Sequence, residues 1–207
     1  MVDLPSGKMK SREGTVVDAD DLITNLVNNA KKISQDLGKT TGMKKSEIDL
    51  LYETVGLGAL KYFILKVDPH KNMLFKPKES IDFNGNTGPF IQYTFARIQS
   101  LLRNYNDQLL LDINDDYKLN KSEKKLIKIM YQFPKILSDS ANQLNPSLIA
   151  NYSYDLSKEF NQFYQKNPIL NNENQHVVIF RLLISKKISE IIKSSMSLLG
   201  ILMPDKM

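Results

Sequence analysis

The chain has 207 residues, 42% of them hydrophobic, which is enough for one packed domain or for a domain with a piece of another. It has no cysteine and two widely separated histidines (His70 and His176), so disulfides, thiolate or histidine metal sites and cysteine nucleophiles are excluded. No apolar run approaches the roughly 20 residues of a membrane helix, and the net charge of +5 weakly favours a polyanionic partner over a merely solvated basic surface.

The first elements in the chain are a loop and a helix. Residues 4–15 are dense in Gly, Ser, Lys and Arg and carry little apolar periodicity, which is typical of an exposed loop. Asp18, Asp20 and Asp21 favour a helix start, since carboxylates in a first turn face the positive end of the helix dipole. We predict a helix from there to residue 37, stopped at Gly38.

A second helix is predicted from a capping-box pattern, Ser46 followed by Asp49. Gly56 and Gly58 lie on it and favour helix formation poorly, so they predict the close approach of another backbone. Residues 68–86 lose the helical period and contain Pro69, Pro77 and Gly85. This stretch predicts an irregular connection with room for a short strand.

Four more helical segments follow. Apolar residues three or four apart predict helices over about 89–105, 122–131, 134–143, 146–163 and 175–199, the second and third being one pair broken at Phe133-Pro134, and Gly200 stops the last. Residues 106–120 are polar and predict a surface loop. The fold class is therefore all-α, a helical bundle preceded by a loop.

Three cations, Lys8, Lys10 and Arg12, lie on a short loop between Gly7 and Gly14. Such a loop can close over a triphosphate and neutralise the charge that develops as pyrophosphate leaves. An exposed basic turn would have the same composition, so residue types alone leave both interpretations open.

The string from Lys8 to Arg12 resembles the KMSKS motif of class I aminoacyl-tRNA synthetases, with Lys10 and Ser11 at its third and fourth places. Residues 4–17, 85–97, 145–164 and 198–207 are together similar to the arginyl-tRNA synthetase family, in family order. The resemblance implies two parts: residues 1–20 as the end of the catalytic domain, and residues 21–207 as the helical anticodon-binding domain named for its DALR motif.

The resemblance also implies roles for residues. The loop would meet the phosphates of ATP, bound with Mg²⁺ as substrate, through Lys8, Lys10, Ser11 and Arg12. Contacts with arginine tRNA would come from Tyr93, Arg97, Tyr164 and Met207. An exposed aromatic ring can stack on an unpaired loop base for about 1–3 kcal/mol, whereas Tyr164 could instead only flank the core beside Phe163. No metal site is implied.

The sequence contains neither the HIGH motif of class I synthetases nor a βαβ pattern with a Gly-rich turn. We therefore expect the 207 residues alone to be inactive, with arginine and ATP bound through the rest of a ligase that attaches arginine to its tRNA. We expect a cytoplasmic monomer that binds no membrane. The alternatives are a free-standing helical RNA-binding or scaffold protein and, more weakly, a peripheral membrane binder. Cations of the last helix could face RNA or water (Arg181, Lys186, Lys187, Lys193).

Overall fold

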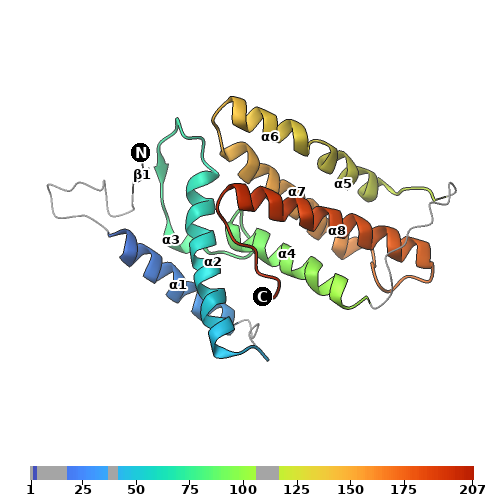
Figure 1. The fold of residues 1–207 in the computed structure, drawn as a ribbon, viewed down its shortest axis with the longest axis horizontal. Coiled ribbons are helices and arrows are strands. Elements are labelled where there is room, and N and C mark those ends of the chain that lie inside the picture. The colour runs from blue at the N-terminus through green and yellow to red at the C-terminus, as the bar shows by residue number, and fades with distance from the viewer. Residues whose placement is uncertain (1, 4–17, 37–41, 106–116) are drawn as a thin grey trace.

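A computed structural model describes residues 2–3, 18–36, 42–105 and 117–207 (Figure 1). Within these ranges the chain is almost entirely helical, as predicted. The helices are α1 (Ala19–Asp36), α2 (Lys45–Leu65), α3 (Pro77–Ser80), α4 (Gly88–Arg103), α5 (Lys121–Tyr131), α6 (Phe133–Asn142), α7 (Ser147–Lys166) and α8 (Gln175–Leu198). The strands β1 (Val2–Asp3) and β2 (Met73–Leu74) form a short parallel pair, with Val2 opposite Met73.

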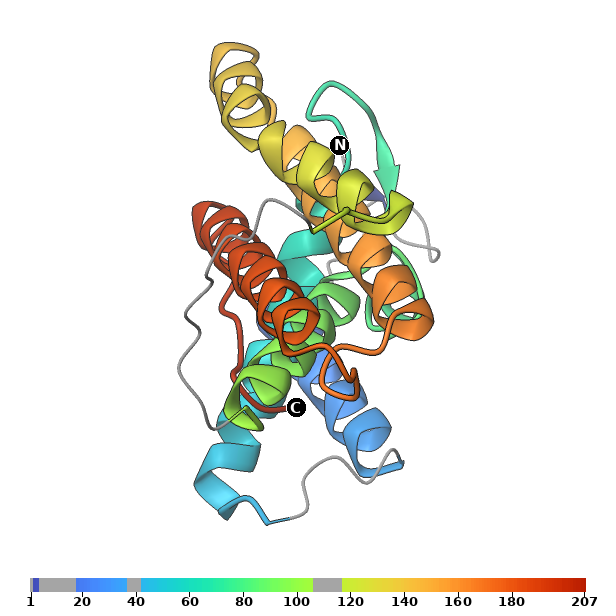
Figure 2. The same ribbon diagram turned by 90° about the vertical axis from the view of Figure 1, so that its right-hand side faces the viewer.

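The helices are arranged around a central bundle of α4, α7 and α8 (Figures 1 and 2). Helix α2 packs on α4 at one end and carries α1 on its outer side, while α5 and α6 pack along α7. The main core is formed by fully buried apolar side chains of the central bundle, joined by Tyr62 of α2. The bundle thus brings α4 and α7 side by side although almost 60 residues separate their starts.

Side-chain caps fix where several helices begin. The Thr87 hydroxyl accepts a hydrogen bond from the Phe90 N–H (3.3 Å), which confirms the predicted cap of α4. The predicted start of α2 was wrong in detail. Helix α2 begins at Lys45, and the Glu47 carboxylate accepts from the Lys44 N–H at 3.0 Å. Ser46 already lies in the first turn, so the longer Glu47 side chain makes the reciprocal contact that the pattern had assigned to Asp49.

The predicted close approach of a second backbone to α2 is confirmed at Gly58. A Cβ added to Gly88, at the start of α4, would lie 2.4 Å from the Gly58 carbonyl oxygen. A Cβ on Gly58 would lie 2.5 Å from Nε2 of Gln92. Neither position has room for a side chain, and this contact sets how α4 leaves α2.

A buried ion pair joins α5 to α8. The Arg181 Nε donates to Oε1 of Glu123 at 2.9 Å, and the Tyr117 hydroxyl donates to the same oxygen at 2.8 Å. The Asn120 N–H donates to Oε2 of Glu123 at 2.9 Å. Arg181 is therefore committed inside the bundle and does not face RNA or solvent. The other three cations considered with it, Lys186, Lys187 and Lys193, are exposed.

Candidate functional site

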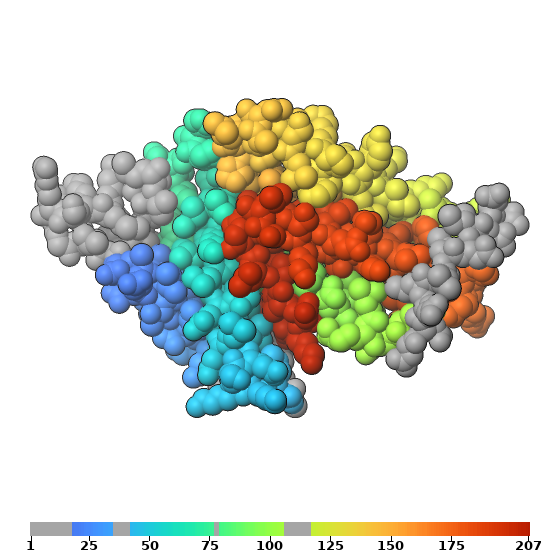
Figure 3. All heavy atoms as spheres, viewed as in Figure 1, coloured from blue at the N-terminus to red at the C-terminus, as the bar shows by residue number. Residues whose placement is uncertain are grey.

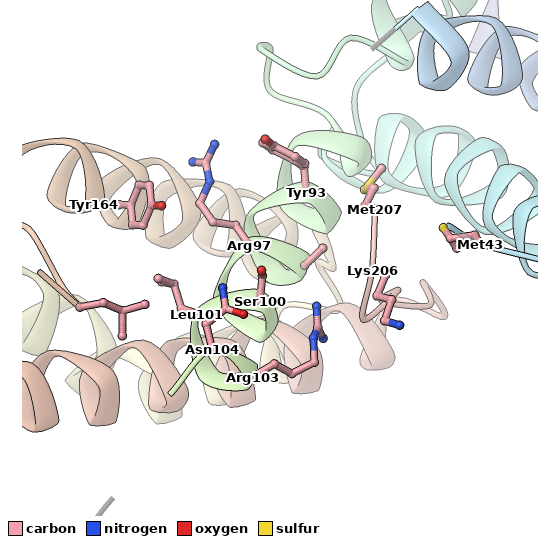
Figure 4. Close-up of a pocket in the computed structure, with 12 residues that line it drawn as sticks. Met43, Tyr93, Arg97, Ser100, Leu101, Arg103, Asn104, Tyr164, Lys206 and Met207 are labelled. Carbon is pink, nitrogen blue, oxygen red and sulfur yellow. The ribbon is translucent and has the colours of Figure 1, made fainter. Parts of the chain in front are cut away.

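A cavity of about 500 Å³ opens between α4, α7 and the segment that follows α8 (Figure 4). We call it the α4–α7 cavity. Its wall includes Tyr93, Arg97, Ser100, Leu101, Arg103 and Asn104 from α4, Tyr164 from α7, Lys206 and Met207 from the final segment, and Met43 from the residues before α2. Four predicted tRNA-binding residues, distant in sequence, thus share one concave surface.

The centre of the site is a cation held between two aromatic rings. The Arg97 guanidinium carbon lies 4.8 Å from the centre of the Tyr93 ring and 5.1 Å from that of the Tyr164 ring. Tyr93 and Arg97 are four residues apart on α4, so they share one face of the helix. Such contacts are stabilising because the ring face is electron-rich. The three side chains therefore form one stack that crosses from α4 to α7 (Figure 4).

The two tyrosines are supported from behind. Tyr93 packs edge-to-face on Phe83, with ring centres 6.5 Å apart, and Tyr164 packs on Phe160 at 6.2 Å. Tyr164 nevertheless keeps 37% of its surface exposed. Its ring is thus held in place and still offers a face to a ligand.

Hydrogen bonds from α7 hold the guanidinium. The Arg97 Nη1 donates to Oδ1 of Asn161, and Nδ2 of Asn161 donates to Oγ1 of Thr94 at 2.7 Å. Sequence reasoning assigned no role to Asn161. Its position three residues before Tyr164 was the available signal, because residues with that spacing lie on one helical face.

The segment 199–207 crosses the surface between α2 and α4, as Figure 3 shows, and brings Met207 to the cavity. Three side chains hold its main-chain carbonyls. Lys61 donates to the oxygen of residue 200 (2.6 Å), Gln92 to that of residue 202 (2.8 Å), and Arg103 to that of residue 205 (3.0 Å). Sequence reasoning missed these three residues, since a carbonyl acceptor leaves no mark in the sequence.

The charge of the cavity wall is positive. Arg97, Arg103 and Lys206 line it, and the wall, as far as the structure describes it, includes no carboxylate side chain. A concave surface with this charge attracts polyanions.

Comparison with known proteins identifies the helical part. Residues 91–207 match the family described as the DALR anticodon binding domain, and this range contains Tyr93, Arg97, Tyr164 and Met207. The chain belongs to the DALR family. Its range begins within α4, and the α4–α7 cavity is built mainly from DALR-domain residues.

The relatives that resemble this DALR chain are arginine–tRNA ligases. The ligase of Flavobacterium psychrophilum is 54% identical over 207 residues, which is 100% of this chain and 34% of the relative. That of Bacteroides thetaiotaomicron is 52% identical over 210 residues, covering 100% of this chain and 35% of the relative. The predicted resemblance to arginyl-tRNA synthetases is confirmed. The chain spans about a third of the length of these curated relatives.

Solved structures agree on the DALR fold. The Thermus thermophilus arginyl-tRNA synthetase matches with a TM-score of 0.89 at 23% identity, over 100% of this chain and 34% of that one. The arginyl-tRNA synthetase of Plasmodium falciparum matches with a TM-score of 0.80 at 28% identity, over 92% of this chain and 34% of that one. The predicted all-α, DALR-type fold is confirmed.

The other predicted site, the loop with Lys8, Lys10, Ser11 and Arg12, lies outside the described residues, as does most of the polar loop predicted at 106–120. Among the residues that the structure describes, no cluster of His, Asp or Glu could hold a metal ion. Over those same residues, no helix is both long enough and apolar enough to cross a membrane.

Proposed function

We propose that this chain is the tRNA-recognition part of an arginine–tRNA ligase and that the α4–α7 cavity receives unpaired bases of the anticodon loop of arginine tRNA. The observation that carries the proposal is the meeting of Tyr93, Arg97, Tyr164 and Met207 in one positively charged cavity. Membership of the DALR family and 54% identity to a named arginine–tRNA ligase support it.

The chemistry of the cavity suits an unpaired RNA loop. Bases that are not stacked in a helix can stack on a tyrosine ring, as the exposed part of Tyr164 allows. Arg103 and Lys206 at the wall suit the phosphates that flank such a base. The cavity thus combines stacking, which tolerates any base, with charge, which makes binding depend on salt.

The loop cations belong to the same proposal. In the complete ligase, Lys8, Lys10, Ser11 and Arg12 would bind the phosphates of the substrate ATP, which enters with Mg²⁺. The HIGH motif and the arginine site would come from the rest of the ligase. We propose a cytoplasmic monomer, and we expect the 207 residues alone to form no arginyl-adenylate.

The alternative of a free-standing RNA-binding or scaffold protein is not favoured. The similarity to arginine–tRNA ligases covers the whole chain, including the KMSKS-like loop, which has no use in a protein that only binds RNA.

The test of recognition is a comparison of two RNAs. The chain is titrated with arginine tRNA and with the same tRNA carrying the anticodon loop of another amino acid's tRNA. We expect the exchange to weaken binding by about tenfold or more, because stacked and hydrogen-bonded bases are lost while the phosphates remain. Equal affinity for the two RNAs at every salt concentration would rule the proposal out.

The test of the loop uses a complete relative of the ligase. Alanine at the positions of Lys8, Lys10 and Arg12 is expected to lower arginine-dependent pyrophosphate exchange by about 100-fold, since charge developing on the phosphates is no longer neutralised. Unchanged exchange would remove the proposed role of the loop and leave the role of the cavity untouched.

A further inference from the structure

Asn161 connects the two helices that form the α4–α7 cavity. Its carbonyl oxygen accepts from Nη1 of Arg97, and its amide nitrogen donates to Oγ1 of Thr94 at 2.7 Å. Thr94 in turn donates to the carbonyl oxygen of Phe90 at 2.8 Å and has no exposed surface. One chain of hydrogen bonds therefore runs from the α4 backbone through Thr94 and Asn161 to the guanidinium.

This chain of bonds permits one orientation of the Asn161 amide. The Thr94 hydroxyl has a single proton, which it donates to the Phe90 carbonyl, so toward Asn161 it acts only as an acceptor. The Asn161 group beside it must be the NH₂ donor, and the carbonyl oxygen must then face Arg97. The identity of the atom that meets the guanidinium follows from the network.

The sequence places these partners by a double spacing. Phe160 and Phe163 are almost fully buried in the core, which turns Asn161 and Tyr164, three residues apart, toward α4. Thr94 and Arg97, also three residues apart, face them from α4. The amide thus meets Thr94 and the guanidinium while the ring of Tyr164 covers the guanidinium face.

We propose that Asn161 is a positioning residue, which holds the Arg97 guanidinium flat between Tyr93 and Tyr164 before RNA arrives. The bond to Asn161 uses Nη1, and Arg97 makes no other hydrogen bond within the described part of the chain. Its remaining N–H groups are thus left to donate to a base edge or phosphate in the cavity. A flexible arginine would lose side-chain freedom on binding, and an ordered one has already lost it. The inference rests on the proposed role of the cavity in tRNA binding.

The first test needs no RNA. The chain has four arginines (Arg12, Arg97, Arg103 and Arg181), so their guanidinium ¹⁵N NMR signals can be assigned by single substitution. Slow rotation of a held guanidinium resolves its two Nη groups. We expect resolved signals for Arg97 in the wild-type chain, averaged signals in Asn161→Ala, and resolved signals in Asn161→Asp, which keeps an acceptor for Nη1. Indifference of the Arg97 signals to Asn161→Ala, or averaging in both variants, would overturn the inference.

The second test measures affinity for arginine tRNA. We expect Asn161→Ala to weaken binding about tenfold in the wild-type background and not at all in an Arg97→Ala background, because Asn161 acts through Arg97. Asn161→Asp should also weaken binding, since its carboxylate neutralises the guanidinium that it holds. The matched control is Gln162→Ala, an exposed neighbour that does not line the cavity, with no expected change.

The outcomes separate this inference from the proposed function. Equal losses from Asn161→Ala in both backgrounds would mean that Asn161 contacts RNA itself, and positioning would be rejected. A wild-type chain that does not bind arginine tRNA would defeat the proposed function, whereas the NMR signals of the free protein would still decide whether Asn161 positions Arg97.

Discussion

Tyr164→Ala tests how much of the RNA affinity comes from one exposed ring. If a base stacks on Tyr164, the substitution should remove about 1–3 kcal/mol of binding free energy. That corresponds to a dissociation constant raised about 5- to 150-fold. Tyr164→Phe keeps the ring and its contacts with Arg97 and Phe160, so most of the affinity should remain.

The same substitution should cost the fold little. The ring is 37% exposed, and the contacts that it loses, a cation–π pair and one aromatic pair, together stabilise the chain by about 1–2 kcal/mol. This is a fraction of the roughly 5–15 kcal/mol of a typical domain, so the variant stays folded. Loss of binding then cannot be attributed to loss of structure.

The assay is fluorescence anisotropy with labelled arginine tRNA at two salt concentrations, with thermal unfolding of each variant as a check. Tyr131→Ala is the matched control. Tyr131 is 86% exposed on α5 and lies outside the cavity wall, so the same chemical change should leave affinity unaltered. The reasoning fails if Tyr164→Ala binds like the wild type, or if Tyr131→Ala is weakened as much.

Three further predictions concern the bundle that carries the site. Arg181→Met should lower the free energy of unfolding by about 3–5 kcal/mol in a urea titration, because it leaves Glu123 buried without its partner; a change below about 1 kcal/mol would contradict this. Gly88→Ala should cost at least about 1–3 kcal/mol, since its Cβ would meet the Gly58 carbonyl at 2.4 Å, and an unchanged urea midpoint would refute it. Burial, and then the hydrogen bond to Glu123, raises the pKa of Tyr117 to about 12. The unfolded chain releases this proton near pH 10, so the stability is complete below that pH and falls as pH rises toward 12; Tyr117→Phe should flatten urea midpoints measured between pH 8 and 11.

Local patterns were enough to predict most helices. The period of three and four that runs from Ile149 to Phe163 follows from the geometry of a single helix, and so do the Thr87 cap and the stop at Gly200, whose φ is +67°. The start of α2 was misassigned because two overlapping acidic candidates, Glu47 and Asp49, fit similar patterns and only the geometry of the turn chooses between them.

Contacts between distant segments were not predictable in this way. Arg181 is indistinguishable in sequence from the exposed lysines of its helix, and its burial depends on Glu123, 58 positions earlier. In the candidate site, the spacing of Tyr93 and Arg97 places them on one face, but their meeting with Tyr164 came only from the family resemblance. The role of Asn161 needed the packing of α4 on α7, which no local pattern encodes.

The final segment is attached through its backbone, and this has a consequence for how its sequence can vary. Lys61, Gln92 and Arg103 hold carbonyl oxygens, which every amino acid possesses. Substitutions at residue 202 or 205 therefore leave the three acceptors in place, whereas residue 200, with its positive φ, tolerates little besides glycine. Relatives can thus change most letters of this stretch and still deliver residue 207 to the same spot.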